Sequence, residues 1–330
     1  MFYKKNFTVP LDNFINRALY HPKKGYYMKK ISFGKDGDFI TAPNISKIFS
    51  EMVFVWIISY WEKFYKDKTI NFIELGAGNG EMMKQIITSS KKFNSFYSNC
   101  NFLICEKSKK LIKVQKEILK KENVRWITNL NNFKKSPTIF FGNEFLDALP
   151  IKQYVKIKNS WYERYVSKKG NNYFFTNILC DLKKIEKKIK FKIPKNLDFL
   201  EISLEENKII KKLNKIIKNN GGCILFIDYA YPGIKMFDTL QAVKNHKKIK
   251  LFDEIGSADI SHLINISFLK RIAKKNDLML EYTTQRDFLI NLGILKRAEI
   301  LASNKKFLEK ANIFYRVNRL IDKKKMGELF

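Results

Sequence analysis

The sequence has few of the residues that build metal sites and disulfide frameworks. Its 330 residues include four cysteines and three histidines, and no two cysteines have a C-x-x-C spacing. Because structural zinc sites and disulfide frameworks depend on such paired cysteines, we expect no metal site and a reducing compartment. Long apolar runs are also missing, since none approaches the roughly 18 uninterrupted apolar residues that a membrane helix needs. We therefore expect no membrane insertion.

Negative charge is scarce as well. Lys and Arg number 63 against 32 Asp and Glu, which gives a formal net charge of +31. Such an excess attracts nucleic acids or acidic surfaces. The densest basic stretch, residues 183–195, interleaves its lysines with Ile185, Ile189, Phe191 and Ile193, as in the outer face of an amphipathic segment. We therefore favour a general richness in lysine over a nucleic-acid-binding surface, which stays open as an alternative.

The chain contains enough apolar residues for a substantial core, since 45% of its residues are hydrophobic. From residue 70 onward, apolar strand patterns alternate with helical ones. Helices are predicted at 80–89, 108–121, 148–153 and 205–219, and strands at 71–75, 101–106, 124–127, 138–143 and 222–228. Apolar strands separated by helices predict an α/β fold with a mostly parallel, doubly wound sheet.

The remaining segments complete a four-part organisation. Helices at 11–19 and 46–64 and a lid loop form an N-terminal segment, 1–66, before the first half of the core, 67–153. Alternating apolar and polar residues predict inserted antiparallel strands over 154–200. The second half of the core and the C-terminal helices occupy 201–330, with a helix near 262–275, a strand at 278–284 and a largely helical end from 291.

A glycine turn follows the first predicted strand, where residues 72–81 read F-I-E-L-G-A-G-N-G-E. Glycines allow a tight turn and let a ligand approach the backbone closely. A dinucleotide-binding loop more often reads G-x-G-x-x-G and faces a pyrophosphate, which an acid at Glu74 would repel, so an NAD-dependent oxidoreductase is disfavoured. The pattern resembles the S-adenosylmethionine (SAM)-binding loop of Rossmann-like methyltransferases. The cofactor-binding residues predicted here are Glu74, Gly76, Ala77, Gly78, Asn79 and Gly80.

A second acid lies at the end of the next predicted strand. Glu106 follows Phe102–Cys105 and comes 26 residues after Gly80. A carboxylate in that place accepts hydrogen bonds from ribose hydroxyls, in SAM as in NAD. Strand, acid, glycine turn, helix, strand and acid in this order predict a cofactor site far more strongly than a lone glycine pattern does.

Further segments along the chain resemble one family, and they extend from about residue 10 to 330. They read Y-H-P-K-K-G-Y-Y (20–27), F-G-K-D-G-D-F-I-T-A-P-N-I-S (33–46), N-E-F-L-D-A-L-P (143–150), D-Y (228–229), D-T-L (238–240), A-D-I-S (258–261), F-L-I-N-L-G-I (288–294) and K-K-M-G-E-L-F (324–330). Together they resemble the MidA-type methyltransferases, which comprise the mitochondrial complex I assembly-factor methyltransferase and its bacterial relatives.

The resemblance implies a Rossmann-like core, SAM as cofactor and symmetric dimethylation of a protein arginine. In the mitochondrial member the target is the 49-kDa-type subunit of respiratory complex I. For a bacterial relative we expect a protein substrate and a cytoplasmic location, with the mitochondrial matrix as the place of the eukaryotic members. An RNA or other nucleic-acid methyltransferase, and a SAM-binding assembly chaperone without catalysis, remain alternatives.

Methylation of arginine requires acceptors for its guanidinium group, which stays protonated and only donates hydrogen bonds. The best candidate is Glu144, just past the strand 138–143, at the carboxyl edge where open α/β sheets bind ligands, and Asn143 at the end of that strand is favoured with it. Asp147 lies three residues further on, and its pattern fits a pocket acid and an acid at a helix N-terminus equally well. Asp228, at the end of the last core strand, and Glu163, in the inserted strands, are candidates for completing an acidic pocket.

The loop from Phe33 to Ser46 is long, is punctuated by glycines and directly precedes the core. We expect it to fold over SAM as a lid. Its polar side chains Asp38, Thr41 and Ser46 are the candidates for cofactor contacts.

Overall fold

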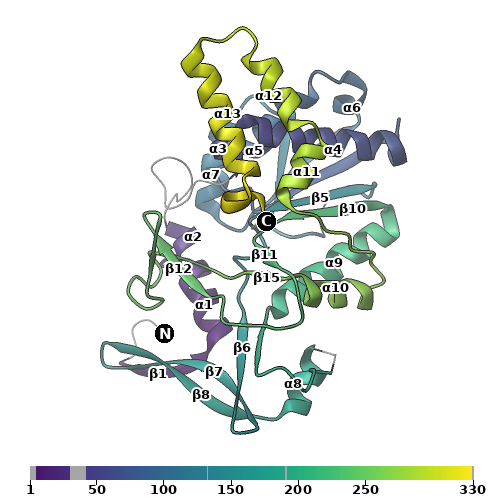
Figure 1. The fold of residues 1–330 in the computed structure, drawn as a ribbon. Helices are drawn as coiled ribbons and strands as arrows, with labels where there is room; N and C mark the ends of the chain where they lie inside the picture. The colour runs from purple at the N-terminus through teal and green to yellow at the C-terminus, as the bar shows by residue number, and fades with distance from the viewer. Residues whose placement is uncertain (1–4, 30–41, 132, 190–191, 329–330) are drawn as a thin grey trace. The chain divides into compact units, whose positions relative to one another are not determined.

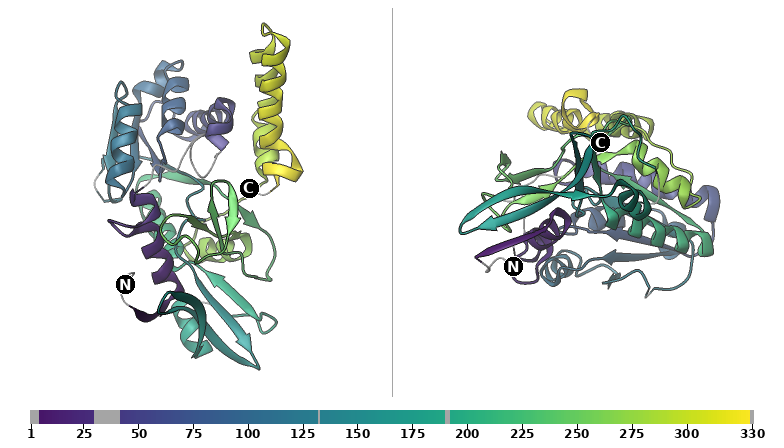
Figure 2. Two further views of the ribbon diagram at one scale, coloured as in Figure 1. Left: turned by 90° about the vertical axis from the view of Figure 1, so that its left-hand side faces the viewer. Right: turned by 90° about the horizontal axis from the view of Figure 1, so that it is seen from below.

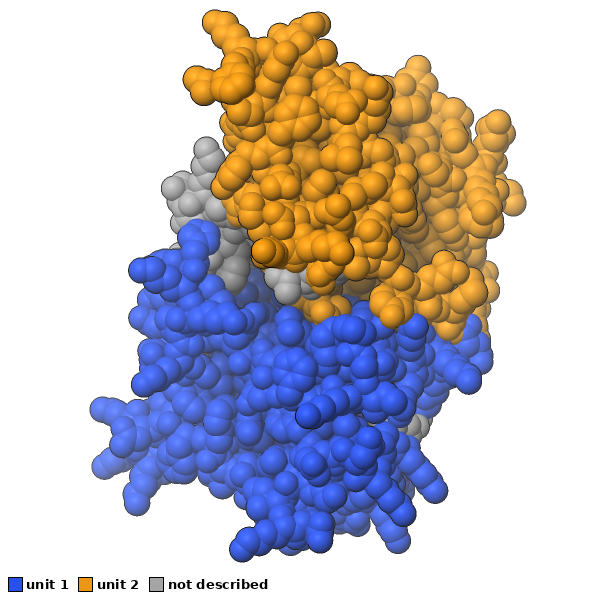
Figure 3. All heavy atoms as spheres, viewed as in Figure 1, with its two compact units in different colours: residues 1–30, 146–211, 231–277 blue, residues 31–145, 212–230, 278–330 orange. Residues whose placement is uncertain are grey.

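The computed structural model describes residues 5–29, 42–131, 133–189 and 192–328. The chain divides into two compact units, each assembled from three separate stretches of sequence (Figure 3). Unit 1 consists of residues 1–30, 146–211 and 231–277, and unit 2 of residues 31–145, 212–230 and 278–330. The four-part organisation expected from the sequence stays a prediction.

Unit 2 contains a five-stranded sheet in the order β10-β5-β2-β3-β4 (Figure 1). All of its neighbouring strands run parallel. Every residue of the central strand β2 is buried, as expected when both faces of a parallel sheet are covered. The parallel α/β core predicted from the sequence is thereby confirmed. Its strands are β2 (Ile70–Leu75), β3 (Cys100–Cys105), β4 (Val124–Ile127), β5 (Thr138–Asn143) and β10 (Gly222–Ile227).

The helices of unit 2 share one apolar core with this sheet. Phe49 of α4, Phe72 of β2, Ile86 of α5, Leu289 of α11 and Leu320 of α13 belong to the same buried cluster. The helices α12 and α13 run side by side and are joined by a short turn (Figure 1). The helical elements of this unit are α3 (Ala42–Ile45), α4 (Lys47–Tyr65), α5 (Glu81–Ser90), α6 (Asn94–Ser98), α7 (Lys109–Ile118), α11 (Gln285–Asn291), α12 (Ile294–Ala302), α13 (Phe307–Ile321) and the π-helical η1 (Lys323–Gly327).

Unit 1 is built around an antiparallel sheet, which confirms the antiparallel strands predicted within 154–200, although residues 182–189 of that stretch form the helix α8. The long strand β7 pairs with β6 and β1 along one edge and with β8 along the other, and Figure 2 shows the β7–β8 ribbon from two sides. The strands of this sheet are β1 (Asn6–Pro10), β6 (Lys152–Ile157), β7 (Ser160–Lys169), β8 (Asn172–Cys180) and β9 (Phe199–Ile202).

Smaller elements complete the chain. The strand β12 (Gln241–Lys244) pairs with β13 (Lys247–Ile249) and β14 (Asp259–Ser261). Ile185 and Ile189 of α8 are buried, as the amphipathic pattern of this basic stretch predicts. No helix in the described ranges has both the length and the apolarity to cross a membrane. The remaining elements are α1 (Leu11–Tyr20), α2 (Tyr26–Lys29), α8 (Leu182–Ile189), α9 (Leu204–Asn220), β11 (Ala230–Tyr231), β15 (Ile264–Asn265) and α10 (Ile266–Lys275).

Two predicted elements are wrong. Residues 148–153 form a turn that leads into β6 instead of a helix. Pro150 explains this, because it lacks an N–H group and disfavours helical backbone at Leu149. Residues 278–284, predicted as a strand, are irregular, and Met279 and Tyr282 are 87% and 55% exposed. The apolar residues that suggested a strand therefore face solvent rather than a neighbouring sheet.

Candidate functional site

The turn between β2 and α5 strongly favours glycine. Gly76, Gly78 and Gly80 have φ angles of +66°, +51° and +88°, in the left-handed region that favours glycine. A Cβ atom on Gly76 would lie 3.1 Å from Cδ2 of Phe145, and one on Gly80 would lie 3.2 Å from Cγ of Gln115. At Gly76 and Gly80 a larger residue would therefore meet both an unfavourable backbone conformation and a close contact.

Hydrogen bonds within the turn fix its shape. The Gly80 N–H donates to the Ala77 carbonyl at 2.7 Å. Oδ1 of Asn79 accepts from the backbone N–H of Glu81 at 3.1 Å, at the first residue of α5. Asn79, predicted as a cofactor residue, thus also orders the start of the helix, and the turn is preformed for a ligand.

Glu74, the next-to-last residue of β2, is a buried carboxylate with one unsatisfied oxygen. Glu74 is 3% exposed, and its Oε2 has no hydrogen-bond partner among the described residues. Burial, reinforced by the negative charge of Glu106, raises the pKa of Glu74 to about 8. Because an unpaired buried carboxylate is costly, this position fits a cationic ligand.

Glu106 is held in a fixed direction just beyond β3. Its Oε1 accepts from the backbone N–H groups of Lys107 and Ser108, both at 2.8 Å. Burial raises the pKa of Glu106, while these N–H groups act in the opposite direction. A fixed carboxylate after the second core strand is the arrangement that accepts ribose hydroxyls in Rossmann-like sites.

Gln115 joins these parts, and it was missed from the sequence. This fully buried residue of α7 donates from Nε2 to the Gly78 carbonyl at 2.9 Å and to Oε2 of Glu106 at 3.4 Å. Its Oε1 accepts from Nε1 of Trp126 at 3.0 Å. The available signal was a polar side chain on the apolar face of a helix, one turn after the buried Leu111.

Three of the predicted catalytic residues lie together at the carboxyl ends of β5 and β10, where Asn143 is in register with Ile227. Nδ2 of Asn143 donates to Oε1 of Glu144 at 3.2 Å. Oδ1 of Asn143 is buried and has no hydrogen-bond partner in the part of the chain that the structure describes. Asp228 accepts from the Phe145 N–H at 3.1 Å. These polar groups form an edge at which open α/β sheets bind ligands.

Phe145 connects this edge to the glycine turn. Its ring limits the space over Gly76 and stacks on Phe226, with centroids 6.2 Å apart and an interplanar angle of 8°. Because β2 and β5 are neighbouring parallel strands, their carboxyl ends open on the same side of the sheet. The two predicted halves of the site are therefore adjacent within unit 2.

Two other predicted catalytic residues belong to unit 1. The carbonyl of the buried Asp147 accepts from the His262 N–H at 3.2 Å. Glu163 of β7 forms a salt bridge with Lys152, and Lys152 also binds Asp12 at 2.9 Å. Glu163 therefore already has a structural partner in its own sheet.

The predicted lid residues are mostly outside the described ranges. Asp38 and Thr41 lie there, together with most of the segment 33–46. Ser46 is described and buried, and its Oγ accepts from the Ile48 N–H at 3.3 Å as the N-cap of α4. Its predicted contact with a cofactor stays a prediction.

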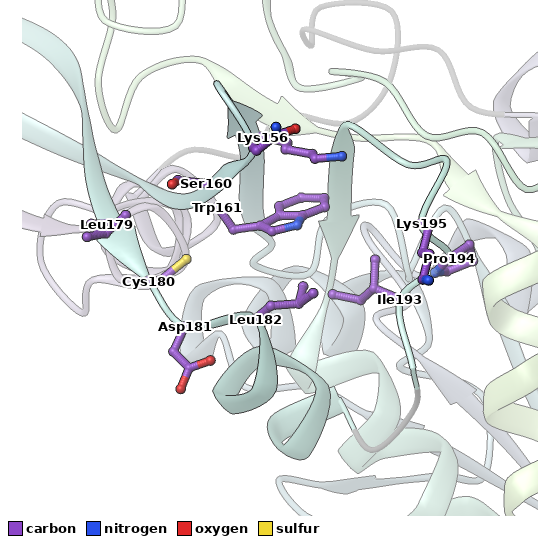
Figure 4. Close-up of a pocket in the computed structure, with 11 residues that line it drawn as sticks. Lys156, Ser160, Trp161, Leu179, Cys180, Asp181, Leu182, Ile193, Pro194 and Lys195 are labelled. Atoms are coloured by element: carbon purple, nitrogen blue, oxygen red, sulfur yellow. The ribbon is translucent and has the colours of Figure 1, made fainter.

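Unit 1 contains a cavity of about 670 Å³, bordered by β6, β7, β8 and α8. Trp161 extends into it, with Lys156 on one side and Ile193 on another (Figure 4). Among the described residues that line it, Asp181 is the one carboxylate. Because this cavity lacks paired acids and a glycine turn, the candidate site is the one in unit 2.

Comparisons with known proteins identify relatives of this chain. A family model described as "Putative S-adenosyl-L-methionine-dependent methyltransferase" matches residues 52–283. The chain is 29% identical to the mitochondrial protein arginine methyltransferase NDUFAF7 of Danio rerio, over 98% of this chain and 82% of the relative. For the Homo sapiens protein of the same name the identity is 28%, over 100% and 81%.

A solved structure shares the fold. It is a Burkholderia thailandensis protein bound to S-adenosyl-homocysteine, with a TM-score of 0.80 and 23% sequence identity, and the match covers 98% of this chain and 86% of that protein. At this identity the likeness establishes the fold.

Proposed function

We propose that this chain, which belongs to the S-adenosyl-L-methionine-dependent methyltransferase family matched by residues 52–283, methylates an arginine side chain of a protein substrate. SAM is the cofactor of this family. The observation that carries the assignment of the site is Oε2 of Glu74, a buried carboxylate oxygen without a partner in the described chain, beside a turn with left-handed backbone at Gly76, Gly78 and Gly80.

The residues present fit SAM. Glu74 would pair with its ammonium group, the Gly76–Gly80 turn would lie along the ligand, and Glu106 would accept from its ribose hydroxyls. SAM supplies a methyl group made electrophilic by its sulfonium. The chain itself must orient the acceptor nitrogen, and alignment of reacting groups can contribute roughly 7–11 kcal/mol.

The edge formed by Asn143, Glu144 and Asp228 suits a guanidinium group. Arginine presents five N–H donors and no acceptor, so it needs several oxygen acceptors in one place. Oδ1 of Asn143 is such an acceptor, because it is buried and unsatisfied among the described residues. The carboxylate of Glu144 holds the guanidinium fork and favours electron density on the reacting nitrogen.

The choice of arginine is supported by the relatives named protein arginine methyltransferases. From the resemblance of the sequence motifs we extend the proposal to symmetric dimethylation, to a complex I subunit of the 49-kDa type as substrate and to action in the cytoplasm. One observation favours a different substrate, RNA, namely the formal net charge of +31.

The test is transfer of labelled methyl from SAM into a lysate of the source organism. We expect label in one protein band, recovered as dimethylarginine after hydrolysis. Glu144→Gln should lower transfer by roughly a hundredfold or more with little change in SAM affinity. Glu299→Gln, at an exposed glutamate paired with Lys296, is the matched control and should keep full activity. Label in RNA would contradict the arginine substrate, and SAM binding without transfer to any acceptor would instead support an assembly chaperone.

A further inference from the structure

The helix α13 carries an exposed apolar stripe. Phe307 and Leu308 are 81% and 79% exposed, and Phe314 and Tyr315 are 43% and 60% exposed. Ala311, between these two pairs, is exposed as well. Contiguous apolar surface of this kind marks an interaction site more often than an ordinary solvent-facing helix.

This stripe is additional to the face by which α13 packs in its own unit. Val317, Leu320 and Ile321 are buried, and they hold the helix in the apolar core of unit 2. A surface helix needs one apolar stripe to dock on its own domain. Phe307 and Leu308 therefore contribute little to the packing of the unit, and the stripe as a whole offers apolar surface to a partner outside it.

The spacing of the stripe is symmetric about Ala311. Phe307 and Leu308 lie four and three residues before Ala311, and Phe314 and Tyr315 lie three and four residues after it. Residues three and four apart share one face of a helix. A pattern that reads the same in both directions matches an identical helix running antiparallel, which is the self-complementarity that a twofold interface needs.

We propose that α13 is the surface through which two copies of this chain associate, antiparallel and about a twofold axis at Ala311. In this pairing, Phe307 of one copy faces Tyr315 of the second copy, and Leu308 faces Phe314. The small side chain of Ala311 lies at the crossing, where it lets the helix axes approach closely.

The available area is sufficient for the centre of such an interface. The exposed parts of the four large side chains amount to on the order of 500 Å² per copy. A stable interface of standard size removes about 800 Å² per partner, with an apolar centre and a polar rim. The stripe supplies the centre, and polar side chains around it supply the rim.

A membrane surface is the other partner that suits an apolar and basic helix. The dependence of binding on salt distinguishes it from a second copy of the chain. Lys305, Lys306 and Lys310 flank the stripe, and Glu309 lies among them, 3.7 Å from Nζ of Lys305. Salt screens repulsion between two cationic copies, so self-association should strengthen with salt. Binding to anionic lipids would weaken with salt. A lipid surface also has no need for a symmetric stripe, which favours the second copy.

The test is sedimentation over a range of protein concentration at low and high salt. We expect a species of twice the 39.1 kDa of the chain, favoured by salt. Ala311→Glu should weaken association by roughly tenfold or more, because it places two like charges at the axis. Since Ala311 is exposed, SAM binding should not change, and thermal unfolding should match that of the wild type at dilutions where both proteins are monomers. Met279→Ser, at a side chain that is 87% exposed elsewhere in unit 2, is the control and should associate like the wild type.

A mixture of variants tests the register. Ala311→Glu and Ala311→Lys should each associate more weakly than the wild type alone and form a tighter mixed dimer together, because opposite charges then meet at the axis. A protein that stays monomeric under all conditions would overturn the proposal, as would a dimer indifferent to Ala311→Glu. Monomers that bind phosphatidylglycerol vesicles, less tightly as salt rises, would assign the stripe to a membrane instead. None of these outcomes depends on methyl transfer.

Discussion

Glu74, the next-to-last residue of β2, and Glu106, directly after β3, are buried carboxylates at the same end of two neighbouring parallel strands. Burial, and then the negative charge of Glu106, raises the pKa of Glu74 to about 8. The two acids differ in their surroundings. Glu106 is satisfied by two backbone N–H groups, whereas Oε2 of Glu74 has no partner in the described chain. A ligand with one ammonium group and a pair of ribose hydroxyls meets both requirements.

The raised pKa of Glu74 predicts how stability without ligand depends on pH. A carboxyl whose pKa is higher in the folded protein contributes stability that is complete below its unfolded value of 4.5 and is lost as pH rises through about 8. The wild type should therefore lose stability relative to Glu74→Gln over this range. Thermal unfolding of both proteins across this pH window measures the difference, and parallel curves would show that Glu74 does not titrate in this way.

The same carboxyl predicts proton release on binding. An ammonium group beside Glu74 favours the ionised form, so SAM should displace a proton near neutral pH and bind more tightly as pH rises toward 8. Calorimetry in two buffers of different ionisation enthalpy counts the protons released. We expect the release in the wild type and its loss in Glu74→Gln. A release of the same size in both would assign it to another group.

Gly76→Ala should abolish most of the affinity for SAM. The alanine must keep a φ of +66°, and its Cβ would lie 3.1 Å from the Phe145 ring. We expect destabilisation of roughly 1–3 kcal/mol and a loss of at least about tenfold in affinity. Gly170→Ala is the matched control, since its φ is +61° and no atom lies within 4 Å of the new Cβ. If both variants bound SAM equally, the turn would not be in contact with the ligand.

Gln115→Ala should weaken both the fold and the site. It removes the partners of the Gly78 carbonyl and of the Trp126 indole, which costs roughly 1–3 kcal/mol for buried groups left unsatisfied. Urea unfolding measures this loss, and titration with SAM measures the accompanying loss of affinity. Gln85→Ala, which removes a hydrogen bond to Glu81 on α5, is the control. An effect no larger than that of the control would mean that Gln115 does not support the turn.

The parts of the site that the sequence predicted are those set by local patterns. The buried run of β2, its acid and the glycine turn are contiguous from Ile70 to Gly80, and the N-E-F segment begins with the last residue of β5. The sequence does not predict the role of Gln115, because its partners Glu106, Trp126 and Gly78 lie just after β3, on β4 and in the glycine turn. Only tertiary packing brings them together. The helix predicted at 148–153 is absent because Pro150 disfavours helical backbone at Leu149, whatever the apolar pattern around it.

The most direct test of the central claim is calorimetric titration of the wild type and Glu74→Gln with SAM and with 5′-methylthioadenosine, which keeps the ribose but lacks the amino-acid part. We predict one SAM bound per wild-type chain and a loss of roughly tenfold or more in SAM affinity for Glu74→Gln. The affinity for 5′-methylthioadenosine should be nearly the same in both proteins, because Glu74 recognises the ammonium group. No SAM binding by the wild type, or an equal loss for both ligands, would contradict the account.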